Sequence, residues 1–122
     1  MAKILIVEDN PDNLKLFRAI LAARGHQVVG LPGGDTLLET MRAEAPQLVL
    51  LDISLPGEDG FQLLAKLQRT PTNDLPPVVA LTAHAESGDQ EKALTAGFSG
   101  YLTKPIDVRT FASTVEAFIP PA

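Results

Sequence analysis

Acidic residues stand directly after two short apolar runs of the chain, where carboxylates could do chemistry. Glu8 and Asp9 follow the run 3–7, and Asp52 follows the run 48–51. Carboxylates that lie close together repel one another, and each then favours its protonated form unless a cation is near. Oxygen ligands of this kind suit Mg²⁺, whereas the lack of cysteine in the chain and of histidine in this set argues against zinc.

A threonine and a lysine end or follow two later apolar runs. Thr82 would supply a hydroxyl donor and Lys104 a positive charge. Together with carboxylates and a divalent cation, these groups would form a pocket for a doubly charged, oxygen-rich group such as phosphoryl. Asp52 is then the candidate nucleophile, because a carboxylate that attacks phosphorus forms an aspartyl phosphate.

Each of these residues has a simpler interpretation when it is considered alone. Glu8 and Asp9 could acidify the first turn of a helix, where the helix dipole favours anions. Asp52 could form a turn before the sequence SLPG, Thr82 could merely end a strand, and Lys104 could be solvated surface. The phosphoryl site is favoured because all five stand at the same edge of one predicted sheet.

Short apolar runs alternate with helical patterns along the chain. The predicted strands span residues 3–7, 26–31, 48–51, 78–82 and 100–103. The predicted helices span residues 10–25, 35–45, 60–69, 87–97 and 107–119, and the last has a stripe of Val108, Phe111, Val115, Phe118 and Ile119. This alternation predicts an α/β fold with a parallel sheet covered on both faces, as one domain over 1–122. Ligands bind such sheets beyond the carboxyl ends of the strands.

Composition excludes several classes of protein. The 122 residues are 45% hydrophobic and carry a formal net charge of −5, without a basic stripe, so direct contact with nucleic acid is not expected. No apolar run approaches the roughly 18 residues of a membrane span. The first residues run into acids and do not fit a secretory signal, so we expect a cytoplasmic location.

Four stretches of the sequence, read together, resemble the receiver domain of two-component response regulators, the CheY-like superfamily. They are ILIVEDN, LVLLDISLPGEDG, VVALTA and AGFSGYLTKP, in that order. The resemblance covers essentially the whole chain, and stand-alone cell-cycle-type receivers and hybrid-kinase receivers resemble it about equally. It implies a doubly wound, flavodoxin-like (βα)5 fold with five parallel strands in the order 2-1-3-4-5.

The resemblance also implies a role for each acid. Asp52 corresponds to the phosphoryl acceptor, and Glu8 and Asp9 to the acidic pair at the metal. The backbone carbonyl of Ser54 would complete the ligands of Mg²⁺, which Mn²⁺ could replace. The pair is Glu-Asp here where two Asp also occur in the family.

Further roles are implied for residues of the later motifs. Thr82 and Lys104 would contact the phosphoryl oxygens, and Pro105 would follow a cis peptide that aims the lysine into the pocket. Tyr101 occupies the aromatic switch position, although an ordinary strand aromatic is an alternative interpretation. His84 lies where the family tunes phosphoryl lifetime. We expect His26 to be a surface residue.

The phosphodonor implied by the resemblance is a phosphohistidine on a histidine kinase or a histidine phosphotransfer protein. Candidates for docking it are Asn13, Leu14, Phe17, Pro105 and Ile106, although Leu14 and Phe17 fit a role in covering the sheet better. A downstream protein would read the surface of helix four, strand five and helix five, and no membrane partner is expected. Such a receiver is no enzyme toward other molecules, since it catalyses only its own phosphorylation and dephosphorylation.

Other interpretations stay open from the sequence. A receiver cut from a larger regulator or hybrid histidine kinase would carry the same motifs, although Met1 close to the first strand favours a natural start. A Mg²⁺-dependent aspartyl-phosphate phosphatase would also use Asp52, but such enzymes commonly place a second acid where Ser54 stands. An unphosphorylated interaction domain would not need the acids, hydroxyl and lysine. Flavin binding is disfavoured because EDNPDN would repel phosphate.

Overall fold

The computed structural model describes residues 2–53, 60–69, 75–82, 89–104 and 106–120. The strands are β1 (Lys3–Val7), β2 (Gln27–Leu31), β3 (Leu48–Asp52), β4 (Val78–Thr82) and β5 (Gly100–Thr103). The helices are α1 (Pro11–Ala23), α2 (Leu37–Glu44), α3 (Gly60–Arg69), α4 (Asp89–Ala96) and α5 (Phe111–Glu116). All five strands are parallel and follow the order β2-β1-β3-β4-β5, which confirms the predicted fold class and strand order.

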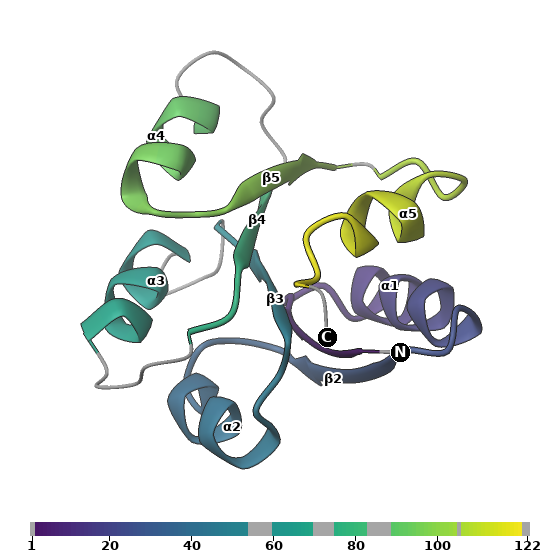
Figure 1. Cartoon of the computed structure of the whole chain (residues 1–122), viewed down its shortest axis with the longest axis horizontal. Coiled ribbons are helices and arrows are strands. Elements are labelled where there is room, and N and C mark those ends of the chain that lie inside the picture. Colours follow the sequence, from purple (N-terminus) through teal and green to yellow (C-terminus); the bar gives the residue numbers. More distant parts are fainter. Residues whose placement is uncertain (1, 54–59, 70–74, 83–88, 105, 121–122) are drawn as a thin grey trace.

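Helices cover both faces of the sheet. α1 and α5 lie on one side, and α2, α3 and α4 lie on the other (Figure 1). Alternate residues of β1 therefore enter different cores: Leu5 and Val7 pack beneath α2 and α3, whereas Ile4 and Ile6 pack beneath α1 and α5. Burial on both faces explains why the central strands read as continuous apolar runs. None of the helices in the described part of the chain could cross a membrane.

The ends of α1 follow the punctuation expected from the sequence. The Asn10 side chain accepts hydrogen bonds from the N–H groups of Asp12 (2.9 Å) and Asn13 (3.2 Å), and Pro11 occupies the first turn. Gly25 follows the helix with a φ of 87°, a left-handed conformation that favours glycine. This capped start matters for the site, because Asn10 directly follows the acidic pair.

The last helix is shorter than predicted. It begins at Phe111 rather than at 107, because Asp107 forms a turn: its side chain accepts from the N–H of Arg109 (2.9 Å) and its carbonyl from that of Thr110 (3.1 Å). Val108 is consequently 56% exposed, and its predicted place on the buried stripe is wrong. Phe111 and Val115 of that stripe are buried as expected.

The side chains of Phe17 and His26 are buried, which does not fit a docking role for the first or a surface position for the second. Phe17 is 1% exposed and stacks on Phe111 at 5.0 Å between ring centroids, which confirms the favoured role of covering the sheet and removes Phe17 as a docking candidate. The His26 side chain is 7% exposed and contacts Glu116, so its predicted surface position is wrong.

Candidate functional site

Four strand ends bring the predicted chemical groups to one edge of the sheet. Glu8 directly follows β1, Asp52 and Thr82 are the last residues of β3 and β4, and Lys104 follows β5. Backbone pairing continues past the strands, because Glu8 donates its N–H to the carbonyl of Leu31 (3.0 Å) and Lys104 donates to that of Thr82 (2.7 Å). These bonds fix where each side chain leaves the sheet.

The three predicted acids converge. One carboxylate oxygen from each of Glu8, Asp9 and Asp52 lies within 4.8 Å of the others. Glu8 is 1% exposed and Asp52 is 2% exposed, whereas Asp9 is exposed to solvent. Two carboxylates are thus withdrawn from water, and burying charge in this way is costly unless a cation compensates it.

Lys104 compensates the two buried acids. Its Nζ lies 2.6 Å from Oε1 of Glu8 and 2.7 Å from Oδ2 of Asp52. Burial lowers the pKa of Lys104, but the hydrogen bonds to Asp52 and Glu8 outweigh it and raise that pKa above its ordinary value. The lysine therefore stays charged and holds the two carboxylates together.

The two oxygens of the Glu8 carboxylate differ in their hydrogen bonding. Burial raises the pKa of Glu8, and the hydrogen bonds from Lys104 and from the N–H of Asn10 counteract that rise. Oε2 accepts the Asn10 N–H at 3.1 Å, which joins the site to the cap of α1. Oε1 is buried and, among the described residues, has no hydrogen bond of good geometry, although the Lys104 ammonium lies close to it.

The donor set fits a hard divalent cation. Among the described residues, the ligand atoms that converge here are carboxylate oxygens, as Mg²⁺ and Mn²⁺ favour, and the incompletely bonded Oε1 of Glu8 leaves capacity for a further cation. Glu8, Asp9 and Asp52 would hold the ion. Ser54, whose carbonyl the family resemblance adds as a ligand, lies outside the described residues, as do Pro105 and His84.

The predicted phosphoryl contacts lie at the same edge. Thr82 is 2% exposed and pairs in register with Thr103, the residue before Lys104. Tyr101 is half-buried, pairs with Ala80 and packs against the core beneath α3 and α4. The structure therefore brings Thr82 and Lys104 together near Asp52, while Tyr101 stands three residues before the lysine on the edge strand.

Gly60 is a structural requirement of the site that composition alone did not specify. A Cβ at this first residue of α3 would lie 2.6 Å from the Cα of Ile53 and 2.8 Å from the carbonyl oxygen of Asp52. The helix thus packs directly on the backbone that carries the acceptor acid. A glycine soon after a chemically suggestive acid is the signal that points to such a close approach.

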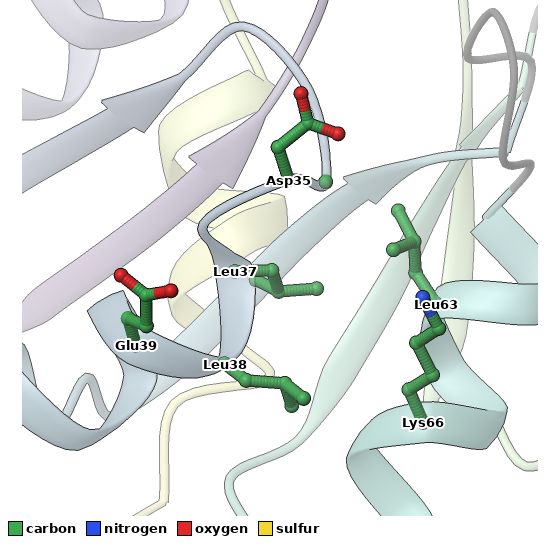
Figure 2. A pocket seen from close by; sticks show the side chains of 7 residues that line it. Asp35, Leu37, Leu38, Glu39, Leu63 and Lys66 are labelled. Atoms are coloured by element: carbon green, nitrogen blue, oxygen red, sulfur yellow. The ribbon is translucent and has the colours of Figure 1, made fainter.

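A hollow that the sequence did not indicate lies between α2 and α3. It has a volume of about 120 Å³. Its leucine floor is formed by Leu37, Leu38 and Leu63, with Asp35, Glu39 and Lys66 around it (Figure 2). None of these residues belongs to the acidic cluster, so the hollow is separate from the site described above.

Comparison with known proteins agrees with this geometry. The fold and the acid-lined edge define a doubly wound α/β domain of the CheY type, as in the chemotaxis protein CheY4 of Vibrio cholerae (TM-score 0.89, 21% identity, 98% of this chain and 99% of that chain). The sequence profile of the response regulator receiver domain matches residues 4–116, and the chain therefore belongs to this family.

Individual relatives are similar over most of their length. The polar-differentiation response regulator DivK of Brucella anthropi is 35% identical over 116 residues, which cover 95% of this chain and 94% of the relative. An uncharacterized 14.6 kDa protein of Leptolyngbya boryana is 38% identical over 104 residues, covering 85% and 79%. Among solved structures, the BeF3-activated receiver domain of Klebsiella pneumoniae RstA has a TM-score of 0.87 at 33% identity, covering 98% and 99%.

Proposed function

We propose that this receiver domain is a phosphoacceptor switch that takes a phosphoryl group from a phosphohistidine onto Asp52 in the presence of Mg²⁺. The observation that carries the proposal is the position of Lys104, whose Nζ lies between the buried carboxylates of Glu8 and Asp52, with Asp9 beside them. The donor is a histidine kinase or a histidine phosphotransfer protein, as family membership supports.

In the proposed transfer, an oxygen of the Asp52 carboxylate forms a bond to phosphorus as the phosphorus–nitrogen bond to the donor imidazole breaks. The other ring nitrogen of the donor carries a proton, so the electron pair of the broken bond leaves a neutral imidazole, and charge and atoms balance without a further reactant. Lys104 faces Asp52 and neutralises negative charge that gathers on the phosphoryl oxygens, and Thr82 donates its hydroxyl to one of them. A bound Mg²⁺ would supply the remaining positive charge.

The proposed output is a change at the surface of α4, β5 and α5. The phosphoryl group contacts Lys104, which already lies beside Asp52, and draws Thr82 inward, and the space that Thr82 leaves lets Tyr101 turn inward. This surface already presents apolar groups to a partner, because Leu94 on α4 is 53% exposed and Val108 before α5 is 56% exposed. The partner read-out is a protein contact in the cytoplasm, without direct binding of nucleic acid or membrane.

The chain would act as a switch and not as an enzyme toward other molecules. It would catalyse only its own phosphorylation and dephosphorylation, which separates it from a Mg²⁺-dependent phosphatase that uses an aspartyl phosphate. The alternative of a receiver within a larger regulator or hybrid kinase would use the same site in the same way.

The test is incubation with Mg²⁺ and acetyl phosphate, followed by intact-mass measurement. We expect one phosphoryl group on the wild type, none on Asp52→Asn, and a wild-type result for Asp35→Asn, which changes an exposed acid outside the cluster. Modification that persists in Asp52→Asn would remove Asp52 as the acceptor. Rapid multiple turnover of a small phosphoester would favour the phosphatase instead.

A further inference from the structure

A polar cluster at the amino-terminal end of the sheet joins the two helices that cover one face. Glu116, the last residue of α5, contacts Arg24, which caps the carboxyl end of α1. Arg24 donates from Nε to Oε2 of Glu116 at 3.1 Å and from Nη2 to Oε1 at 2.5 Å. Oε2 also lies 2.8 Å from Nε2 of His26. We call Arg24, His26 and Glu116 the polar clasp.

Both ring nitrogens of His26 are engaged. Nδ1 accepts a hydrogen bond from the backbone N–H of Ala2 at 3.1 Å. Because an amide N–H can only donate, Nδ1 carries no proton, and Nε2 is therefore the nitrogen that donates to Glu116. The polar clasp thus reaches from the end of α5 to the starts of β1 and β2, which also pair at Lys3 and Gln27.

The placement of Glu116 is unfavourable for α5 by itself. A negative charge at the carboxyl end of a helix opposes the helix dipole, whereas Arg24 at the carboxyl end of α1 is well placed. Hydrogen bonds from Arg24 first, and from His26 second, lower the pKa of Glu116 to about 2. The acid is therefore stabilised by residues 92 and 90 positions earlier in the chain and not by its own helix.

The two ends of α5 are held differently. A helix of six residues is not stable without tertiary contacts, and α5 packs through Phe111 and Val115. Beyond its carboxyl end, the Phe118 ring lies 2.5 Å from where a Cβ of Gly100 would be, so this end is pressed against β5. Before its amino end, in the segment that follows Lys104, Val108 is exposed.

We propose that the polar clasp is a positioning device that fixes the carboxyl end of α5 to α1. Phosphorylation then changes residues 106–112, which follow Lys104, and leaves residues 113–119 in place. A partner protein that binds α5 would contact one end that stays fixed and one end that changes on phosphorylation. The response to phosphorylation rests on the proposed function, but the hold of the clasp on α5 does not, and α1 and α5 lie on the same face of the sheet (Figure 1).

The hold of the clasp is tested first without metal or phosphodonor, by hydrogen–deuterium exchange with mass spectrometry. Glu116→Gln and Arg24→Gln should each make residues 113–119 exchange roughly threefold faster, as expected for the loss of a partly exposed ion pair. The double variant should exchange no faster than Glu116→Gln, because that single variant already removes the contacts of Glu116 to both Arg24 and His26. Glu44→Gln is the matched control, since it breaks the Lys3–Glu44 pair (3.1 Å), which does not involve α5.

The response is tested by repeating the exchange with Mg²⁺ and beryllofluoride. In the wild type and in Glu44→Gln, the change should be confined to residues 106–112, whereas in Glu116→Gln it should extend through 113–119. An equal wild-type change at both ends of α5, or single variants that exchange like the wild type without ligand, would overturn the proposal. If beryllofluoride produces no Asp52-dependent change anywhere, the proposed function fails, and the metal-free comparison still decides whether the clasp holds α5.

Discussion

Replacing Lys104 by methionine should make the domain bind Mg²⁺ more tightly while making the metal-free protein less stable. In the wild type, Nζ of Lys104 lies 2.6 Å and 2.7 Å from the carboxylates of Glu8 and Asp52, which are 1% and 2% exposed. A metal cation that binds these carboxylates must share them with the Lys104 ammonium or displace it. Methionine has a similar length without the charge, so it leaves two buried acids close together that a bound metal can neutralise in place of the lysine.

The magnitude follows from the burial of the three groups. Removal of one partner from a fully buried ion pair costs about 3–5 kcal/mol, and a surface pair is worth at most about 1 kcal/mol. The Lys104 side chain is 16% exposed, so we expect a loss of about 3 kcal/mol in the metal-free protein. If about half of that energy opposes the metal in the wild type, the variant gains roughly tenfold in Mg²⁺ affinity.

The assay combines calorimetric titration with Mg²⁺ and thermal unfolding with and without the metal. A tenfold gain in affinity corresponds to about 1.4 kcal/mol of added stabilisation at saturating metal, which is about 5 °C in midpoint for a domain of this size. Lys3→Met is the control, because it removes a lysine that is paired with Glu44 and begins β1, whereas Glu8 follows the other end of that strand. Equal or weaker Mg²⁺ binding by Lys104→Met would refute the competition between the lysine and the metal.

Two further predictions concern the supports of the site, and a third concerns the polar clasp. Gly60→Ala should cost about 1–3 kcal/mol, because its Cβ would lie 2.6 Å from the Ile53 Cα, whereas Gly33→Ala, with nothing within 4 Å, should be close to neutral in urea unfolding. Asn10→Ala should cost about 1 kcal/mol by the same measurement, since it removes the cap of α1. The wild type should lose its advantage in thermal midpoint over Glu116→Gln as the pH falls from about 4.5 toward 2, because a lowered pKa stabilises the fold only while the acid is ionised. A midpoint difference that stays constant over this pH range would contradict that assignment.

The strands of the sheet and the polar residues at their carboxyl ends could be predicted because local sequence patterns indicate both. Runs such as 48–51 are apolar at every position, which indicates a strand buried on both faces, and β3 is indeed buried throughout. Once the strands are parallel, their carboxyl ends must meet at one edge. The resemblance to receiver domains implied in addition that β1 and β3 are neighbours, and this pairing brings Glu8, Asp9 and Asp52 within 4.8 Å.

Both a local turn and contacts between distant residues overrode the patterns of the sequence. The apolar stripe from Val108 onward predicted a longer last helix, but the turn at Asp107 competes with its first turn and leaves Val108 exposed. Phe17 is buried through a long-range contact, because it stacks on Phe111, almost a hundred residues later. Periodicity places such a residue on a helix face but does not identify what that face meets.

His26 is a second residue whose burial depends on partners that are distant in sequence. A histidine between a glycine and a strand is usually exposed, and nothing within ten residues of it predicts burial. Its partners are the Ala2 N–H, near the start of the chain, and Glu116, near the end. Glu116 itself stands where the helix dipole disfavours it, and a charge in a locally unfavourable position indicates a distant partner. That mismatch was visible in the sequence, and it points to the residue through which α5 is fastened to α1.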